Sequence, residues 1–182
     1  MKMFVVRAGD VRAGQKSFRQ FNLDNKISSV AFSVKLNLKN THDSETVMQA
    51  LEKQGITTDS ARRIASELLT FAHDIKKGDL IFTPDSRRKF QDILVGKVVE
   101  PYLYWPSEHN DDLFSDNGPI RHILEDVEWH KTTLPRKEMP ETICSAGHAK
   151  SGVDLRGTVF EIKSPESRRD LLEEMRKRNI EF

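Results

Sequence analysis

Hydrophobic residues near the start of the chain recur with the period of β-strands. Residues 3–8 are mostly apolar and end at Gly9, which is typical of a short buried strand. Residues 28–36 alternate between apolar and polar positions, the pattern of a strand with one buried side. Residues 10–27 show neither pattern, and we expect them to form a long loop anchored by its phenylalanines.

Apolar residues spaced three and four positions apart then predict two consecutive helices. The first begins at Asp43 or Ser44 and ends before Gly55. The second covers about residues 59–75 and ends before Gly78, where lysines suit a helix C-terminus. Its apolar positions form one continuous face made of Ala61, Ile64, Ala65, Leu68, Leu69, Ala72 and Ile75.

The second half of the chain is richer in strands. Gly96 and Pro101 are expected bend or bulge points, and Pro165 opens a C-terminal helix. The expected strands cover residues 79–83, 93–105, 120–132 and 158–162. The residues expected to face a common interior, against the second helix, are Phe4, Val6, Val30, Phe32, Ile81, Leu94, Val98 and Val127.

This order of elements predicts an α+β fold with a strongly bent mixed β-sheet and flanking helices. It contains no βαβ repeat, which argues against a doubly wound parallel sheet. The expected organisation is one domain over residues 1–163. Residues 164–182 form a helix that packs on this domain or extends from it.

Composition narrows the class of protein. The 182 residues suit a single domain, and the hydrophobic fraction of 37% with ten Phe argues against a disordered chain. The 29 basic and 28 acidic residues give a net charge of +1, so nucleic-acid affinity would need a local basic patch. A single cysteine, Cys144, excludes an internal disulfide and suits a reducing, cytoplasmic setting. No apolar run is long enough to span a membrane.

Short motifs in a fixed order suggest a family. Phe-Val-Val-Arg-Ala-Gly opens the chain at residues 4–9, and a helix ends in Phe71 before Gly-Asp at residues 78–79. Ile-Leu-Val-Gly-Lys-Val at residues 93–98 leads to Tyr-Leu-Tyr-Trp, and a later strand closes in Val-Glu-Trp129. Over residues 3–163 this order resembles the EVE-like branch of the PUA-like superfamily. The nearest likeness is to the N-terminal reader domains of Mrr-type and McrB-type modification-dependent restriction enzymes.

The resemblance implies a PUA-like pseudo-barrel with a pocket for one flipped, modified DNA base, used in restriction or phage defence. Readers of this family are usually fused to a nuclease or motor, so the partners expected here are nucleic acid and a separate nuclease or motor subunit. The chain departs from the family at Phe32 and at Leu68 and Leu69, where the family often has Trp, and residues 133–152 match no part of it.

A reader of a flipped base needs aromatic or apolar walls and polar groups for the base edge. We expect the pocket between the ends of the first two strands, against the second helix. Tyr102 is a further candidate wall, and core packing is the commoner role for any one of these aromatics. Tyr104 and Trp105 are adjacent on a strand, so at most one of them lines a given pocket. The expected pocket residues are Arg7, Ala8, Gly9, Phe32, Ser33, Phe71, Tyr104 and Trp105.

Basic clusters provide candidate phosphate contacts. The residues expected to bind phosphates are Arg12, Lys16, Arg87, Arg88 and Lys89, with Arg19 as a further loop candidate. A third cluster comprises Arg168, Arg169 and residues 176–178, where interleaved acids suit a solvated helix surface equally well.

Catalytic signatures are weaker. Glu161 and Lys163, with Asp154 upstream, match the core of PD-(D/E)xK nucleases, in which carboxylates hold Mg²⁺. The six His form no metal-binding pattern, and no phosphate-binding glycine loop is present. We therefore expect a binding module without a cofactor, a metal or a catalytic site of its own. The alternatives are an RNA-binding PUA-like domain, a small Mg²⁺-dependent nuclease, or an interaction module that binds no nucleic acid.

Overall fold

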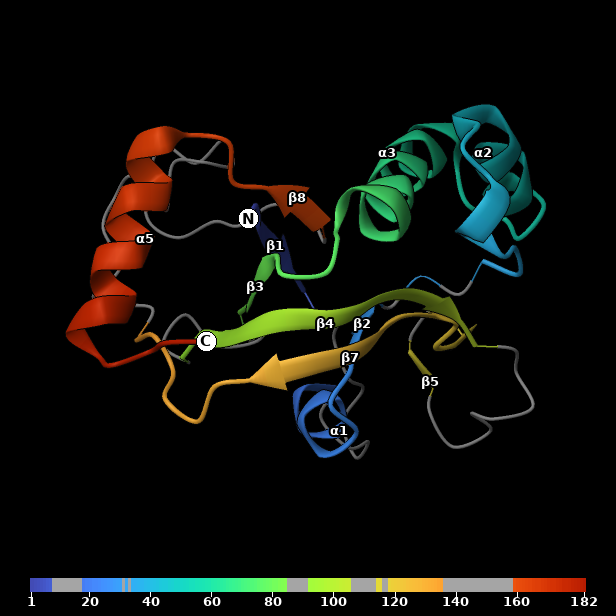
Figure 1. Cartoon of the computed structure of the whole chain (residues 1–182). Coiled ribbons are helices and arrows are strands. Elements are labelled where there is room, and N and C mark those ends of the chain that lie inside the picture. The colour runs from blue at the N-terminus through green and yellow to red at the C-terminus, as the bar shows by residue number, and fades with distance from the viewer. Residues whose placement is uncertain are drawn as a thin grey trace.

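A computed structural model describes residues 1–7, 18–30, 32, 34–84, 92–105, 114–115, 118–135 and 159–182. Six strands form one mixed sheet in the order β2-β7-β4-β3-β1-β8 (Figure 1). β1 and β3 run parallel, and every other neighbouring pair in this sheet is antiparallel. β2 and β8 are its edges among the described residues, so hydrogen bonding does not close the sheet. The six strands are β1 (Met3–Val6), β2 (Ser28–Val30), β3 (Leu80–Thr83), β4 (Leu94–Tyr104), β7 (His122–Trp129) and β8 (Val159–Glu161).

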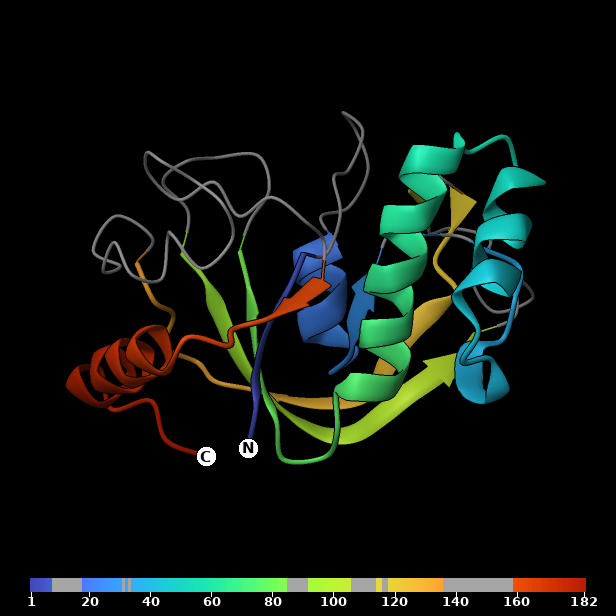
Figure 2. The same cartoon turned by 90° about the horizontal axis from the view of Figure 1, so that it is seen from above.

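Helices cover the sheet at opposite ends. Figures 1 and 2 show α2 and α3 together at one end and α5 at the other. No helix of the described chain is long and apolar enough to cross a membrane. The helical elements are α1 (Phe18–Asp24), a 3₁₀ turn (Leu38–Asn40), α2 (Ser44–Glu52), α3 (Thr58–Leu69), the π-helical turn η2 (Thr70–Asp74) that continues α3, and α5 (Pro165–Lys177).

Local sequence signals explain where these helices begin and end. The Asp43 carboxylate accepts hydrogen bonds from the backbone N–H groups of Glu45 and Thr46, which caps α2 as expected. The Ser164 hydroxyl caps α5 in the same way. Gly78 adopts a φ of +86°, a left-handed conformation that suits glycine where the chain leaves η2 for β3.

The expected interior is confirmed almost completely. Seven of its eight members belong to one buried cluster, and Leu94 is buried outside that cluster. The α3 residues Ala61, Ile64, Ala65 and Leu68 pack into the same cluster, so the apolar face of this helix covers the sheet as expected. A second cluster joins Met3, Val5, Leu80, Phe82 and Val95 to Leu171 and Met175, so α5 packs on the opposite face of the strands.

The structure also corrects several expectations. Residues 18–24 form α1 rather than part of a loop, because Phe21 gains packing against Trp105 that no local periodicity signals. β2 ends at Val30, although Phe32 and Val34 keep the expected buried side. Between the expected strands over residues 93–105 and 120–132, β5 (Phe114–Ser115) and β6 (Gly118–Pro119) form a small separate two-stranded antiparallel sheet.

The irregularity in β4 lies elsewhere than expected. The register against β7 shifts between Val98 and Glu100, not at Gly96 or Pro101. Gly96 has a different role, because a Cβ atom there would lie 2.6 Å from Val127 Cγ1 and 2.8 Å from Trp129 Cε3. The absence of a side chain at Gly96 therefore allows Trp129 to lie close to the β4 backbone.

Candidate nucleic-acid interface

The base pocket expected from sequence is only partly within the described residues. Ala8, Gly9 and Ser33 lie outside them. Phe32 and Phe71 are both buried in the main core, where they pack with the strands and α3. Both rings therefore form part of the packed hydrophobic core.

The two adjacent aromatics at the end of β4, Tyr104 and the following Trp105, lie on opposite sides of the sheet, as their strand positions predict. Tyr104 lies against His122, with ring centroids 5.6 Å apart. Trp105 contacts Phe21 of α1 edge-on and belongs to a separate apolar cluster with Ile123. Trp105 is therefore separated from Phe32 and Phe71.

Arg7 follows β1 directly and is half-buried. Its Nε atom is buried and has no hydrogen-bond acceptor among the described residues. A buried donor without an acceptor is costly, which makes Arg7 a candidate contact for a polar ligand at this end of β1.

Tyr102 and His122 form a buried hydrogen-bond chain between the strands. The Nε2 atom of His122 lies 3.1 Å from the carbonyl oxygen of Val34, which can only accept, so Nε2 carries the proton. The Tyr102 hydroxyl then donates to His122 Nδ1 at 2.9 Å and accepts from the backbone N–H of Leu38 at 3.2 Å. Burial lowers the pKa of His122 to about 4, and burial also raises the pKa of Tyr102. Both side chains are therefore neutral near pH 7 and brace residues 34–38 against β4 and β7.

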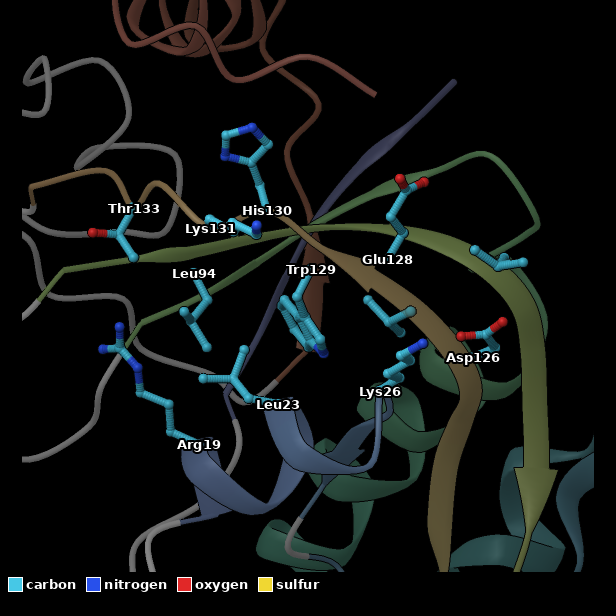
Figure 3. Close-up of a pocket in the computed structure, with 12 residues that line it drawn as sticks. Arg19, Leu23, Lys26, Leu94, Asp126, Glu128, Trp129, His130, Lys131 and Thr133 are labelled. Carbon is cyan, nitrogen blue, oxygen red and sulfur yellow. The ribbon is translucent and has the colours of Figure 1, made fainter.

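A hollow of about 650 Å³ lies between α1, the end of β7 and the start of β4 (Figure 3). Trp129, the last residue of β7, lies between Leu23 and Lys26 in this view, with Leu94 nearby. We call this hollow the Trp129 groove. It is lined by Arg19, Leu23, Lys26, Leu94, Val99, Asp126, Val127, Glu128, Trp129, His130, Lys131 and Thr133.

Two contacts hold the indole of Trp129 in place. Its Nε1–H donates to the carbonyl oxygen of Ile27 at 3.2 Å, which satisfies the only polar group of the side chain. Gly96 is the direct partner of Trp129 across the β4–β7 ladder and leaves room for the ring beside the strand. The ring is therefore a positioned apolar wall of the groove.

The groove carries charges of both signs. Arg19 comes from α1, Lys26 lies in the turn after it, and Lys131 follows β7. Arg19 is positioned by a 3.0 Å hydrogen bond from Nη1 to the carbonyl oxygen of Asp92. The acids Asp126 and Glu128 of β7 also line the hollow, but the alternation of side chains along the strand places them on the other face from Trp129, as Figure 3 shows for Glu128. The aromatic wall and the nearby cations can hold a planar ligand that carries a phosphate.

The other phosphate candidates divide between described and undescribed parts of the chain. Arg12, Lys16, Arg87, Arg88 and Lys89 lie outside the described residues. Arg19 is in α1 and lines the Trp129 groove. The C-terminal cluster lies on α5 and just after it.

The nuclease alternative is also only partly described. Asp154 lies outside the described residues, while Glu161 pairs with Lys2 at 3.6 Å and Lys163 is exposed. No group of three or more His, Cys, Asp or Glu side chains in the described ranges is arranged to hold a metal ion.

Sequence reasoning missed the Trp129 groove because it required α1. Residues 10–27 were expected to be a loop, so nothing placed Arg19, Leu23 and Lys26 opposite Trp129. The usable signal was the Val-Glu-Trp ending of the strand, which brings a large aromatic to a strand terminus.

The comparisons with known proteins give a family but no activity. Residues 5–143 match the model of a family described as a domain of unknown function (DUF8426), and the chain belongs to this family. No curated protein matches the chain.

Proposed function

We propose that this chain is a nucleic-acid-binding domain that accepts a modified DNA base flipped out of the duplex. The Trp129 groove is the observation that carries the proposal. A flipped base needs an apolar face to stack on, polar groups at its edge and cations near its phosphates. The groove combines the aromatic wall with nearby cations.

The volume of the groove and the fixed position of its aromatic ring support a flipped base as the ligand. Its volume of about 650 Å³ falls within the range of small-molecule sites, about 300–1,000 Å³. The Trp129 ring is held by Ile27 and lies beside Gly96, so stacking would cost little side-chain entropy. Stacking of a base on an aromatic side chain contributes about 1–3 kcal/mol.

The curvature of the sheet supports a PUA-like pseudo-barrel of the EVE kind. β1 and β2 are not hydrogen-bonded neighbours, yet their Cα atoms approach within 8 Å. Helix α3 and the turn η2 pack into the concave side of the same strands. A strongly bent sheet with a helix on its inner side is the architecture that the sequence resemblance implies.

The end of β1 is the second location for the base. Arg7 offers a buried Nε–H there that has no acceptor in the described part of the chain, and the edge of a base could accept from it. The Trp129 groove is the stronger site because it has both an aromatic wall and a hollow large enough for a base. The two locations can be separated by variants, since Arg7 does not line the groove.

The proposed biological role is recognition without catalysis, in the cytoplasm. A separate nuclease or motor subunit would act on the DNA that this domain marks, in restriction or phage defence. RNA in place of DNA is the alternative ligand, and it presents the same chemical groups to an aromatic wall and cations.

A binding screen tests the proposal. The probes are duplexes with 5-methylcytosine, 5-hydroxymethylcytosine, N6-methyladenine or no modification, together with a structured RNA. We expect one modified duplex to be preferred. Trp129→Ala should weaken its binding roughly 5- to 150-fold, the equivalent of about 1–3 kcal/mol. Trp129→Phe keeps a ring and should lose less.

Two results would contradict parts of this account, and one control variant accompanies them. Equal binding of all duplexes by the wild type would contradict the recognition of a modified base. Loss of preference in Arg7→Gln but not in folded Trp129→Ala would move the base to the end of β1. The control Trp105→Phe keeps a ring against Phe21 of α1, changes an aromatic that does not line the groove, and should leave the preference intact.

A further inference from the structure

We infer that one face of α5 contacts the phosphodiester backbone of the nucleic acid that the domain binds, an inference that rests on the proposed function. Arg168, Arg169 and Arg176 line a hollow of about 360 Å³ on this helix, together with Pro165 and Leu172. The described lining contains three cations and no acid. We call this surface the arginine face.

The charges of α5 are segregated rather than mixed. Lys177 pairs with Glu173 at 3.1 Å and with Glu174 at 2.9 Å, and Arg178 pairs with Glu174 at 2.8 Å. The hydrogen bond with Glu174 raises the pKa of Lys177, and the same contact lowers the pKa of Glu174. These cations are matched by acids one turn away on their own helix, whereas no acid is among the described residues that line the arginine face.

The three arginines differ in how they are held. Arg168 donates from Nη2 to the carbonyl oxygen of Met1 at 2.7 Å, which orients its guanidinium and leaves other donors free. Arg169 lies 3.5 Å from the carboxylate of its neighbour Asp170, and because the Arg169 side chain is exposed the pair contributes at most about 1 kcal/mol. Arg176 is exposed. A phosphate can therefore compete for Arg169 and bind Arg168 and Arg176 at little cost.

The spacing of the arginines suits a polyanion better than a single small anion. Arg169 and Arg176 are seven residues apart, which is two helical turns and about 10 Å along the axis. Phosphates of one strand repeat about every 3.4 Å along duplex DNA, so this span covers about three of them. Pro165 and Leu172 line the same hollow and give it an apolar surface against which the arginine side chains can lie extended.

The position of α5 connects this surface to the proposed base site. Figure 1 shows α5 beyond the end of the sheet toward which β7 runs, and Trp129 is the last residue of β7. After α5, Phe182 packs edge-on against His130 with ring centroids 5.7 Å apart, and His130 lines the Trp129 groove. A bound nucleic acid whose base enters the groove would thus pass the same end of the molecule as α5.

The test measures binding of one labelled duplex at several salt concentrations. The double variant Arg169→Gln/Arg176→Gln removes two exposed cations and spares Arg168, which holds the N-terminus. The control Lys35→Gln/Lys39→Gln removes two exposed cations away from α5 and gives the same change in net charge.

The slope of log K against log salt is about −0.9 per phosphate contact for duplex DNA. We therefore expect the α5 double variant to reduce the slope by about 1.8 and to weaken all duplexes alike, with base preference unchanged. The control should keep the wild-type slope. Equal slopes for both double variants and the wild type would overturn this inference alone.

Other anionic partners would give different results. An anionic lipid vesicle or a polyglutamate peptide that binds through these arginines more tightly than duplex DNA would overturn the inference. Absence of any nucleic-acid binding by the wild type would instead overturn the proposed function, and the inference with it.

Discussion

Acid should destabilise this domain in a pH range set by one buried residue, His122. Its ring is fully buried, its Nδ1 accepts from Tyr102, and its Nε2 donates to Val34. Protonation would place an unsolvated charge there and force two donors together at Nδ1. Burial accordingly lowers the pKa of His122 from 6.5 to about 4, and the nearby Arg121 charge acts in the same direction.

The size of the effect follows from proton linkage. Because the folded-state pKa lies below the unfolded value, the unfolded chain takes up the proton first as the pH falls. The stabilisation is fully present above pH 6.5 and is lost progressively down to about pH 4. The difference between a pKa of 6.5 in the unfolded chain and about 4 in the fold corresponds to about 3 kcal/mol of folding stability, of which about 2 kcal/mol is lost by pH 5. That is a large share of a typical domain stability of about 5–15 kcal/mol.

Urea unfolding between pH 7.5 and pH 5.0 measures this effect. The carboxylates of Asp43 and Glu174, whose pKa values are also lowered, lose their stabilisation at lower pH, starting from ordinary values of 3.8 and 4.5. The change in unfolding free energy above pH 5 therefore reports on histidine rather than on these carboxylates. His122→Gln should be less stable at pH 7.5 but should lose most of the pH dependence, whereas His130→Gln should keep it. Parallel pH profiles of the wild type and His122→Gln would refute this reasoning.

Two further substitutions test the packing around the network and the groove. Gly96→Ala should lower the free energy of unfolding by about 1–3 kcal/mol, because its Cβ would lie 2.6 Å from Val127 Cγ1 and 2.8 Å from the Trp129 ring. Oligonucleotide affinity should fall with it as the ring is displaced, and an unchanged unfolding midpoint would contradict the close approach. Tyr102→Phe should cost about 1–3 kcal/mol, since it leaves His122 Nδ1 and the Leu38 N–H without their partner. Unfolding in urea at pH 7.5 measures this loss, and oligonucleotide affinity per folded molecule should be unchanged.

Much of the fold could be predicted because local signals agreed with the packing. The apolar face of α3, the capping Asp43 and the left-handed Gly78 are all encoded within a few residues. The inward positions of the strands followed from the two-residue period alone. Helix α1 could not be predicted in this way, because its seven residues are held by tertiary contacts such as the one between Phe21 and Trp105.

The site was less predictable than the fold because it depends on which faces meet. The opposite orientation of Tyr104 and Trp105 was predictable from their adjacency, but Trp105 as a wall for Phe32 and Phe71 required a shared face that the structure does not provide. The role of Gly96 was also hidden, since only the cross-strand register places it opposite Trp129. Arg7 lies at the end of β1 as expected, and its contact with a base stays a prediction.

Fluorescence of Trp129 tests the central claim most directly, because the chain has only two tryptophans. Trp105→Phe leaves Trp129 as the sole tryptophan, and Trp129→Phe leaves Trp105. In a titration with the preferred duplex, we predict quenching of Trp129 that saturates with the dissociation constant measured by an independent binding assay. The Trp105 signal of the matched variant should stay constant. Tight binding of the duplex with no change in Trp129 emission would contradict stacking of a base in the groove.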